Sequence, residues 1–304
     1  MLSGSDEHGT PITVTADETG KSPQAVVDEN HDAIFASLVE LGCSWGQTLD
    51  RRGVEFGGAL YGRTSDPRHH ELVQDILLEL HENGFLIQET MEQFCSVADD
   101  GGIKFLPDRY VQGVCPACSA EGARGDQCDA CGATYEANEL KDPVSKLNPE
   151  IPVEIRETDH LFFRLDLLQD DLETHAASRR STWKPNVRAM TQNWLNMGLR
   201  PRAVTRDIEW GVKIPLDDEV WGEKRVYVWF DAVQGYLTCA RIWSERIAEE
   251  SGSESDIWRR WWMDSGNLRH IYFMGKDNIP FHTIIWPGIL TVSYTHLRAH
   301  ETSE

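Results

Sequence analysis

The residues best suited to chemistry in this sequence follow a short apolar run near its C-terminal end. The run at 270–274 predicts a buried strand, and it ends at Gly275, where a helix begins that carries Asp277 and His282. In an open α/β fold, ligands bind in the crevice outside the carboxyl ends of the strands. Polar residues at such a position face a ligand, so the sequence predicts a chemical role for this edge of a sheet.

Two further strand ends carry polar residues. The first residues of the chain predict the end of a strand, followed by Asp6, a turn at Gly9 and a helix start at Pro11. The run 226–230 predicts another strand, which leads through Asp231 into a helix. Taken singly, the first pattern also fits an acidic helix cap and the second fits core aromatic residues.

Four of the seven cysteines form two C-x-x-C pairs separated by nine residues, namely Cys115, Cys118, Cys128 and Cys131. Two such pairs present four thiolates tetrahedrally, which is the closed arrangement of a structural zinc site. A catalytic zinc ion would need an open position, and no additional donor has a suitable spacing. The alternative is four unrelated cysteines. The odd total and the clustering favour metal binding over a disulfide framework.

Helical and β-rich segments alternate along the chain. Helical apolar periods cover four segments, 23–41, 72–80, 164–176 and 186–198. Asn83 and Gly84 end the second helix, and Gly198 ends the fourth. Between them, residues 85–157 show short alternating runs with glycines, prolines and the cysteine pairs, which predicts a β-rich insertion with a small core of its own.

Bulk properties limit the class of protein. With 304 residues and 40% hydrophobic residues the chain is long enough to bury a core. The net charge of −21 is spread along the chain, which indicates a solvated acidic surface and disfavours a broad basic face for nucleic acid. An RNA partner stays open. No apolar run approaches the roughly 20 residues that span a bilayer, and we expect a cytoplasmic protein without a membrane partner.

Together these motifs resemble methionyl-tRNA synthetase, a class I aminoacyl-tRNA synthetase, in its archaeal and eukaryotic type. The resemblance covers about residues 2–290, through S-D-E-H-G-T-P-I at 5–12, Y-G-R-T at 61–64, F-L-P-D-R at 105–109, the cysteine pairs, V-W-F-D-A at 228–232 with G-Y at 235–236, and G-K-D-N-I-P-F-H at 275–282. The order and spacing of these motifs match the family.

The resemblance implies an α/β fold, with a partial Rossmann-like catalytic domain and an inserted zinc-binding connective domain. It divides the chain into residues 1–90, the first part of the catalytic domain; 91–202, the connective domain with the four-cysteine zinc knuckle; 203–290, the second part of the catalytic domain; and 291–304, a non-native tail. The letters of the tail resemble a translated sequencing adapter, and the alternative is an ordinary polar tail.

The resemblance also implies site residues. Asp6 would pair with the substrate α-ammonium group, and Arg206 would pair with a carboxylate or phosphate; both are the expected catalytic residues. The methionine pocket would be lined by Trp229, Ala232, Tyr236 and His282, since aromatic rings hold a polarizable thioether well. ATP would bind at His8, Gly9, Gly275, Lys276 and Asp277. For Lys276, a solvated surface charge is the alternative.

The implied activity is that of a ligase. It would activate methionine with ATP and Mg²⁺ to methionyl-adenylate and transfer methionine to the 3′ end of tRNA(Met), with one structural Zn²⁺ per chain. Two class I signatures are absent from the sequence, H-x-G-H and K-M-S-K-S, so we expect the fragment to be inactive alone. Gln234 is unusually polar for a pocket neighbour. The alternatives are a zinc-ribbon RNA-binding or regulatory relative without catalysis and a synthetase for another apolar amino acid.

Overall fold

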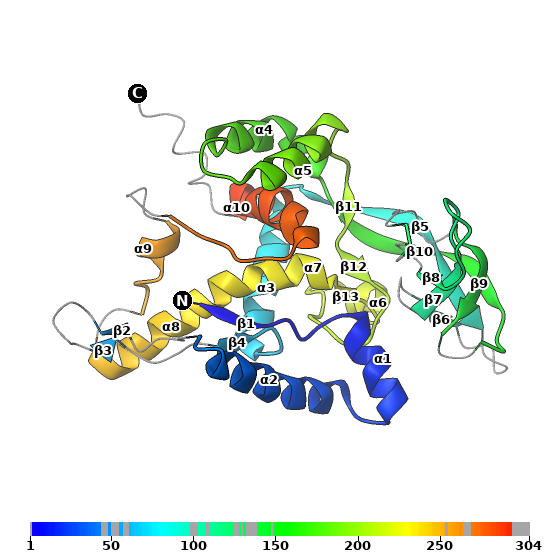
Figure 1. The fold of residues 1–304 in the computed structure, drawn as a ribbon, viewed down its shortest axis with the longest axis horizontal. Coiled ribbons are helices and arrows are strands. Elements are labelled where there is room, and N and C mark those ends of the chain that lie inside the picture. Colours follow the sequence, from blue (N-terminus) through cyan, green and yellow to red (C-terminus); the bar gives the residue numbers. More distant parts are fainter. Residues whose placement is uncertain are drawn as a thin grey trace.

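The computed structural model describes residues 2–43, 48–49, 55–56, 61–97, 103–106, 110–124, 128, 130–131, 139–146, 149–252, 255–263 and 269–293. Part of the F-L-P-D-R motif, at 107–109, and the end of the tail, at 294–304, lie outside these ranges. Figure 1 shows a body of helices around a short parallel strand pair, with a β-rich unit on one side.

The parallel pair lies at the centre of the helical body. β1 (Ser3–Ser5) pairs with β4 (Tyr61–Arg63), which places Gly4 opposite Gly62. A Cβ atom on Gly4 would lie 2.5 Å from the Gly62 carbonyl oxygen, and one on Gly62 would lie 2.5 Å from Cys239 Sγ on α8 (Gly235–Ser251). Glycine at both positions therefore permits a close approach of the two strands and the helix.

Three helices lie where the sequence predicts them. α1 (Thr10–Thr19) has Pro11 in its first turn, and α2 (Pro23–Glu40) is capped by the Ser22 side chain. α3 (Pro67–Glu82) ends at Asn83, and Gly84 takes the left-handed conformation with φ 75°. Its predicted apolar face is buried, at Leu72, Val73, Ile76, Leu77 and Leu80. These predictions are confirmed.

The β-rich insertion consists of two antiparallel sheets. One has the order β11 (Arg202–Ala203), β10 (Val153–Phe163), β5 (Leu86–Val97), β6 (Ile103–Phe105). The other has the order β8 (Ala123–Arg124), β7 (Val111–Val114), β9 (Lys141–Ser145). Phe94, Leu106, Tyr110 and Leu140 form part of a separate buried cluster with two of the paired cysteines. The predicted small core is thus confirmed.

A buried polar cluster joins β10 to the hairpin of β12 (Thr205–Arg206) and β13 (Arg225–Val226). Asp207 accepts from His160 Nε2 at 3.0 Å and from Lys224 Nζ, and the Lys224 residue is only 8% exposed. Thr205 Oγ1 lies 2.9 Å from His160 Nδ1. The cluster therefore connects the long strand of the insertion to the helical body.

Helices α4 (Gln169–Ser178), α5 (Pro185–Asn196) and α10 (Trp286–Ser293) lie together at the top of Figure 1. The two predicted helices at 164–176 and 186–198 are confirmed, although the first begins as a 3₁₀ turn, η3 (Leu165–Leu168). Thr191 Oγ1 on α5 lies 2.9 Å from Thr283 Oγ1 in the turn before α10.

The predicted strand at 226–230 is wrong beyond its first residue. β13 ends at Val226, and α7 (Val228–Asp231) follows, because the amides of Phe230 and Asp231 bond the Tyr227 carbonyl at 2.8 and 3.1 Å. The turn sends Phe230 into the main core, at 2% exposure, and leaves Trp229 half-buried.

The predicted buried strand at 270–274 is also wrong. No regular structure forms there, and Ile271 and Phe273 are 65% and 86% exposed. A strand requires a neighbour that accepts its main-chain hydrogen bonds, and none of the described strands pairs with this segment. It continues into η5 (Lys276–Asn278), a π-helical turn, η6 (Phe281–Ile285), and then α10.

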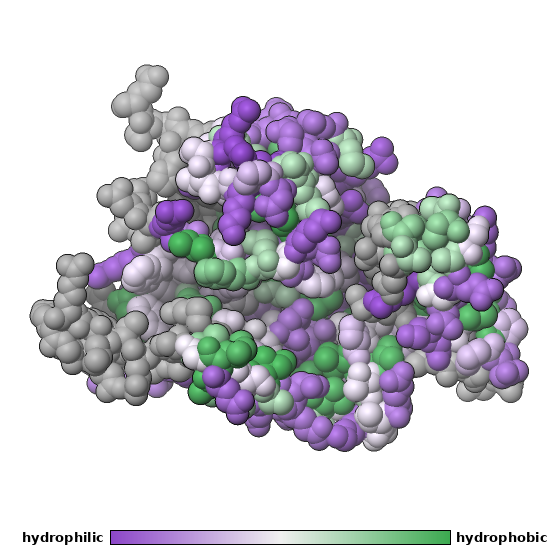
Figure 2. Space-filling view, viewed as in Figure 1, coloured by the Kyte–Doolittle hydropathy of each residue, from purple (hydrophilic) through white to green (hydrophobic). Residues whose placement is uncertain are grey.

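The remaining described elements are β2 (Thr48–Leu49), β3 (Glu55–Phe56), α6 (Asp218–Trp221), η4 (Ala232–Gln234) and α9 (Arg259–Trp262). In the described part of the chain, no helix combines the length and apolar character needed to cross a bilayer. Figure 2 shows mostly hydrophilic residues on the visible face, with hydrophobic side chains gathered over α2, where Ile34 and Val39 are exposed.

Candidate active site

A cavity of about 750 Å³ opens beside the end of β1, against α7, α8 and the segment that leads into α10. Its lining includes five residues that the sequence predicted for the amino-acid site: Asp6, Trp229, Ala232, Tyr236 and His282. Three predicted junctions, far apart along the chain, therefore meet at one cavity, even though two of the predicted strands are absent.

Asp6 provides the carboxylate at the end of β1. The side chain is accessible from the cavity, but protein surrounds the carboxylate closely. This burial and the charge of Asp231 raise the pKa of Asp6 to about 7, against an opposing effect of His8. A positive group that enters the cavity would stabilise the charged form of Asp6.

Tyr236 and His282, which also line the cavity, form a polar contact. His282 Nδ1 donates to the Asn278 carbonyl at 2.8 Å, which leaves Nε2 to accept from the Tyr236 hydroxyl, also at 2.8 Å. Burial lowers the pKa of His282, so the imidazole stays neutral. Tyr272 packs edge-on against both rings, with centroids 5.1 and 5.5 Å away. The hydroxyl therefore has a fixed direction.

An aromatic wall completes the cavity. The Trp229 ring stacks on Phe281 with a centroid distance of 5.1 Å and an interplanar angle of 21°. Val233 also lines the cavity, whereas Gln234 is fully buried and donates to the Phe230 carbonyl at 3.0 Å. The polar character of Gln234 therefore does not reach the cavity.

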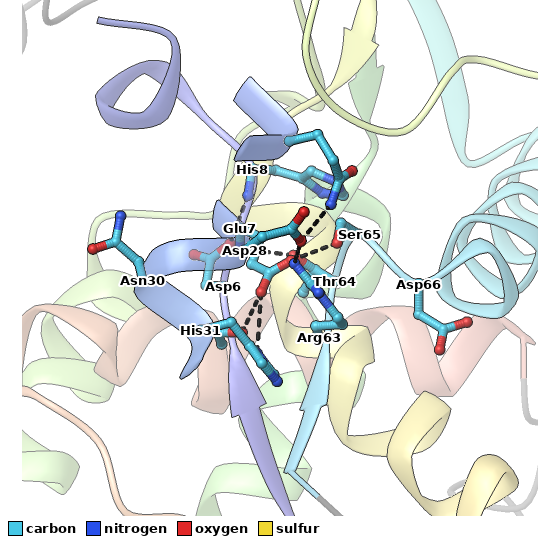
Figure 3. A network of polar contacts seen from close by, with 12 residues as sticks. Asp6, Glu7, His8, Asp28, Asn30, His31, Arg63, Thr64, Ser65 and Asp66 are labelled. Atoms are coloured by element: carbon cyan, nitrogen blue, oxygen red, sulfur yellow. Dashed lines mark hydrogen bonds and ion pairs between the residues drawn. The ribbon is translucent and has the colours of Figure 1, made fainter. Parts of the chain in front are cut away.

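A buried carboxylate behind Asp6 was not predicted from the sequence. Glu7, 2% exposed, accepts from Ser5 Oγ at 2.6 Å and from Arg63 Nε at 2.8 Å. Its backbone amide donates to Thr64 Oγ1 at 2.8 Å. Figure 3 shows Arg63 and Ser65 reaching Glu7 from β4 and the turn after it, and His31 reaching it from α2. The contacts fix the main chain on either side of Asp6.

Several predicted residues do not line the cavity. Gly275, Lys276 and Asp277 are exposed, on the stretch between the lining residues Phe273 and Asn278. The Arg206 guanidinium group lies 3.9 Å from the centre of the Tyr227 ring and donates to the carbonyls of Thr205 and Ala203. His8 and Gly9 are buried. The roles of these residues stay predictions.

The four paired cysteines form a second candidate site, in the insertion. Their sulfur atoms all lie within 4.8 Å of one another, with Cys115 and Cys128 buried and Cys118 and Cys131 exposed. Two of the sulfur–sulfur distances are 3.9 and 3.7 Å. A tetrahedral zinc ion with bonds of about 2.3 Å separates its sulfur ligands by about 3.8 Å, so the cluster fits zinc.

The fold and the cavity at the end of β1 define a class I tRNA synthetase catalytic fold. The chain belongs to the family described as tRNA synthetases class I (M), whose model matches residues 1–302.

Named relatives agree with this assignment. A methionine–tRNA ligase of Nocardioides sp. is 45% identical over 295 residues, which are 95% of this chain and 45% of the relative. One from Thermoplasma acidophilum is 44% identical over 290 residues, 95% of this chain and 48% of the relative. The chain thus spans about half the length of the curated relatives it matches.

Solved structures support the fold. A Mycobacterium tuberculosis methionyl-tRNA synthetase bound by methionyl-adenylate superposes with a TM-score of 0.61 at 24% identity. The match covers 96% of this chain and 46% of that one. At this level of identity the likeness shows the fold alone.

Proposed function

We propose that the chain is the amino-acid-binding part of a methionine–tRNA ligase. The observation that carries the proposal is the single cavity shared by Asp6, Trp229, Tyr236 and His282. Relatives named methionine–tRNA ligase are 44–45% identical over 95% of the chain. The whole enzyme would join methionine to ATP as methionyl-adenylate and then pass methionine to the 3′ end of tRNA(Met).

The cavity suits methionine at both ends of the molecule. The Asp6 carboxylate would bind the α-ammonium group, whose charge draws the proton from Asp6. Trp229 and Ala232 would contact the side chain, since aromatic faces attract a polarizable sulfur atom. The Tyr236 hydroxyl, directed by His282, would distinguish the thioether from a methylene group.

ATP and Mg²⁺ would bind at the rim of this cavity. Gly275, Lys276 and Asp277 are exposed beside it, where backbone and a carboxylate can meet the ribose and phosphates. In the reaction, a methionine carboxylate oxygen attacks the α-phosphorus and pyrophosphate leaves. The adenylate then acylates the terminal adenosine of the tRNA, and AMP leaves. Such catalysis rests on positioning and on stabilising the phosphate charge.

The cysteine cluster would hold one structural Zn²⁺ in the connective domain, residues 91–202. Its own hydrophobic cluster is small, so the metal would supply much of the local stability. No open coordination position is needed, because the ion takes no part in the reaction.

Two measurements on the purified chain test the proposal. Isothermal calorimetry should detect binding of methionine to the chain, and Asp6→Asn should abolish this binding. The control is Glu29→Asn, which changes an exposed surface ion pair and should leave methionine binding unchanged. Norleucine should bind more weakly and isoleucine not at all; tighter binding of another apolar amino acid would support a different synthetase.

Because H-x-G-H and K-M-S-K-S are missing from the sequence, we expect no ATP–pyrophosphate exchange. Robust methionine-dependent exchange would refute the inactivity of the fragment.

A further inference from the structure

A buried histidine–carboxylate pair lies directly behind the cavity. His8 Nδ1 contacts Asp231 Oδ2 at 2.9 Å, and the two side chains are 1% and 0% exposed. The second ring nitrogen, Nε2, lies 3.2 Å from His70 Nε2 on α3. Among the residues that the structure describes, the other carboxylate oxygen of Asp231 has no hydrogen-bond partner. His8 is therefore the group that compensates this buried carboxylate.

The pair connects the two walls of the cavity. His8 follows Asp6 by two residues, and Asp231 follows Trp229 by two residues and precedes Ala232. The same segments meet again at Gly9, where a Cβ atom would lie 3.0 Å from a methyl carbon of Val228. The separation between the Asp6 carboxylate and the aromatic wall is thus set by contacts of residues that do not line the cavity.

We propose that the His8–Asp231 pair is a positioning element of the amino-acid site, which fixes Asp6 against the helix of Trp229 and keeps Asp6 available as a carboxylate. The proposal rests on the proposed function of the cavity and adds a role for two residues that do not line it. Removing His8 or Asp231 would displace the aromatic wall that contains Trp229. It would also leave the charge of the remaining partner uncompensated next to Asp6.

The groups that face the pair support this electrostatic role. His69 and His70 approach from α3, and burial together with His8 lowers their pKa values to about 3 and about 4, so both are neutral. The uncharged Trp210 ring packs at a steep angle to His8, with ring centroids 5.9 Å apart. From the same segment as His8 come Asp6 and Glu7, and Glu7 is paired with Arg63.

The pair itself retains a proton at neutral pH. Burial lowers the pKa of His8, but Asp231, Asp6 and Glu7 outweigh it and the net shift is upward. Burial raises the pKa of Asp231 as well, against the effect of His8. With one proton between the imidazole and the carboxylate, the pair as a whole carries no net charge. Loss of His8 would leave one negative charge facing Asp6.

Methionine binding tests the positioning role. In calorimetry at pH 7, His8→Gln should raise the Kd for methionine at least tenfold. The matched control is His160→Gln, which removes another buried histidine from its aspartate, Asp207, and should leave the Kd within twofold. The double variant His8→Gln/Asp231→Asn, a neutral pair that can still hydrogen-bond, should restore most of the affinity.

Carbon-13 NMR of labelled aspartate carboxyls tests the electrostatic role without methionine, with Asp6→Asn to assign the resonance. The Asp6 midpoint should be near 7 in the wild-type chain, should rise by about one pH unit in His8→Gln, and should return in the double variant. A purely structural role would not move it. An Asp6 midpoint and a methionine Kd that His8→Gln leaves unchanged would overturn the proposal.

Two outcomes separate the proposals. If the wild-type chain binds no methionine at any pH, the proposed function fails, while the Asp6 midpoint still decides the role of the pair. If His8→Gln does not fold, the double variant carries the test: retention of the midpoint near 7 and of methionine affinity supports the proposal, and loss of both in a folded protein overturns it.

Discussion

Single side chains set the polarity of the cavity, because their hydrogen bonds fix which atom donates a proton and which accepts it. His282 donates from Nδ1 to a carbonyl, so its Nε2 can only accept, and the Tyr236 hydroxyl can only donate to it. The lone pairs of that hydroxyl then face the cavity together with its ring. A substrate atom near Tyr236 meets an oriented oxygen and not a freely rotating one.

Tyr236→Phe should therefore weaken methionine binding about fivefold, or about 1 kcal/mol, because it removes the oriented oxygen that the substrate meets. It should also leave His282 Nε2 without its donor, and so reduce the preference for methionine over norleucine. Calorimetry with both amino acids measures the two effects. Tyr110→Phe is the control, because it removes a hydroxyl bonded to Thr13, outside the cavity lining. Equal losses in the two variants would contradict a specific role for Tyr236.

Among single residues, the sequence predicted those that line the cavity but not the buried residues that hold them in place. Asp6 and His282 could be predicted because each lies at a recognisable turn. The partner of Glu7, Arg63, is 56 residues away in the chain, and the partner of His8, Asp231, is 223 residues away. A single sequence contains no signal for such pairings, since charge complementarity alone would allow many others. Tyr272 was missed because it was assigned to the interior of a strand.

Among the elements, we expect the three-stranded sheet of the insertion to depend most on a bound metal ion. Its strands are short, and the two cysteine pairs lie on either side of β8. We expect the purified chain to contain one zinc ion, measured by plasma emission spectrometry. Removal by a chelator, or Cys128→Ser, should abolish amide-exchange protection in β7–β9 while α3 stays protected.

Cys43→Ser is the control for this experiment, since Cys43 lies outside the cluster and should leave zinc content and protection unchanged. Retention of the fold of β7–β9 after complete removal of the metal would show that the hydrophobic cluster suffices there.

The link between β10 and the β12–β13 hairpin should be sensitive to acid. Burial raises the pKa of Asp207, but His160 and Lys224 outweigh this effect, so the pKa lies below its usual value. The folded state thus gains stability above the unfolded pKa of about 3.9, and loses it as the pH falls further, through the folded pKa.

Asp207→Asn should accordingly lower the free energy of unfolding by about 3 kcal/mol at pH 7, because it leaves Lys224 buried without its anion. The difference from the wild-type chain should shrink toward pH 3. Urea unfolding at both pH values measures it, with Asp166→Asn, at a pair about 30% exposed, expected to cost less than about 1 kcal/mol. A difference that does not depend on pH would exclude the charge as its cause.

Element prediction succeeded where the apolar period was long and bounded by caps. α3 had both, with five buried residues at helical spacing and an Asn–Gly end. It failed at 226–230 and 270–274, because a short apolar run is compatible with a strand, a helical turn or an exposed segment. Apolarity favours burial without fixing the backbone, and hydrogen-bond partners elsewhere in the fold decide between these structures.

For the whole molecule, the net charge of −21 is the dominant long-range property. Repulsion among unpaired carboxylates opposes the compact state, and salt shortens its range from about 10 Å at 0.1 M to about 3 Å at 1 M. The melting temperature at pH 7 should therefore rise by several degrees between 0.1 and 1 M KCl. Near the isoelectric point, about 4.9, the same change in KCl should have little effect. A melting temperature that falls with salt at pH 7 would indicate that attractive ion pairs dominate.

The close contact of Gly4, Gly62 and Cys239 limits how this site can be redesigned. Gly4 and Cys239 line the cavity, and the parallel strands beneath it leave no room for a Cβ atom at either glycine. At Gly4 the wall of the cavity is therefore main chain, which substitution cannot trim. Variants that accept a longer or bulkier amino acid would have to come from the helical wall, where Trp229 and Ala232 can each be replaced without moving a strand.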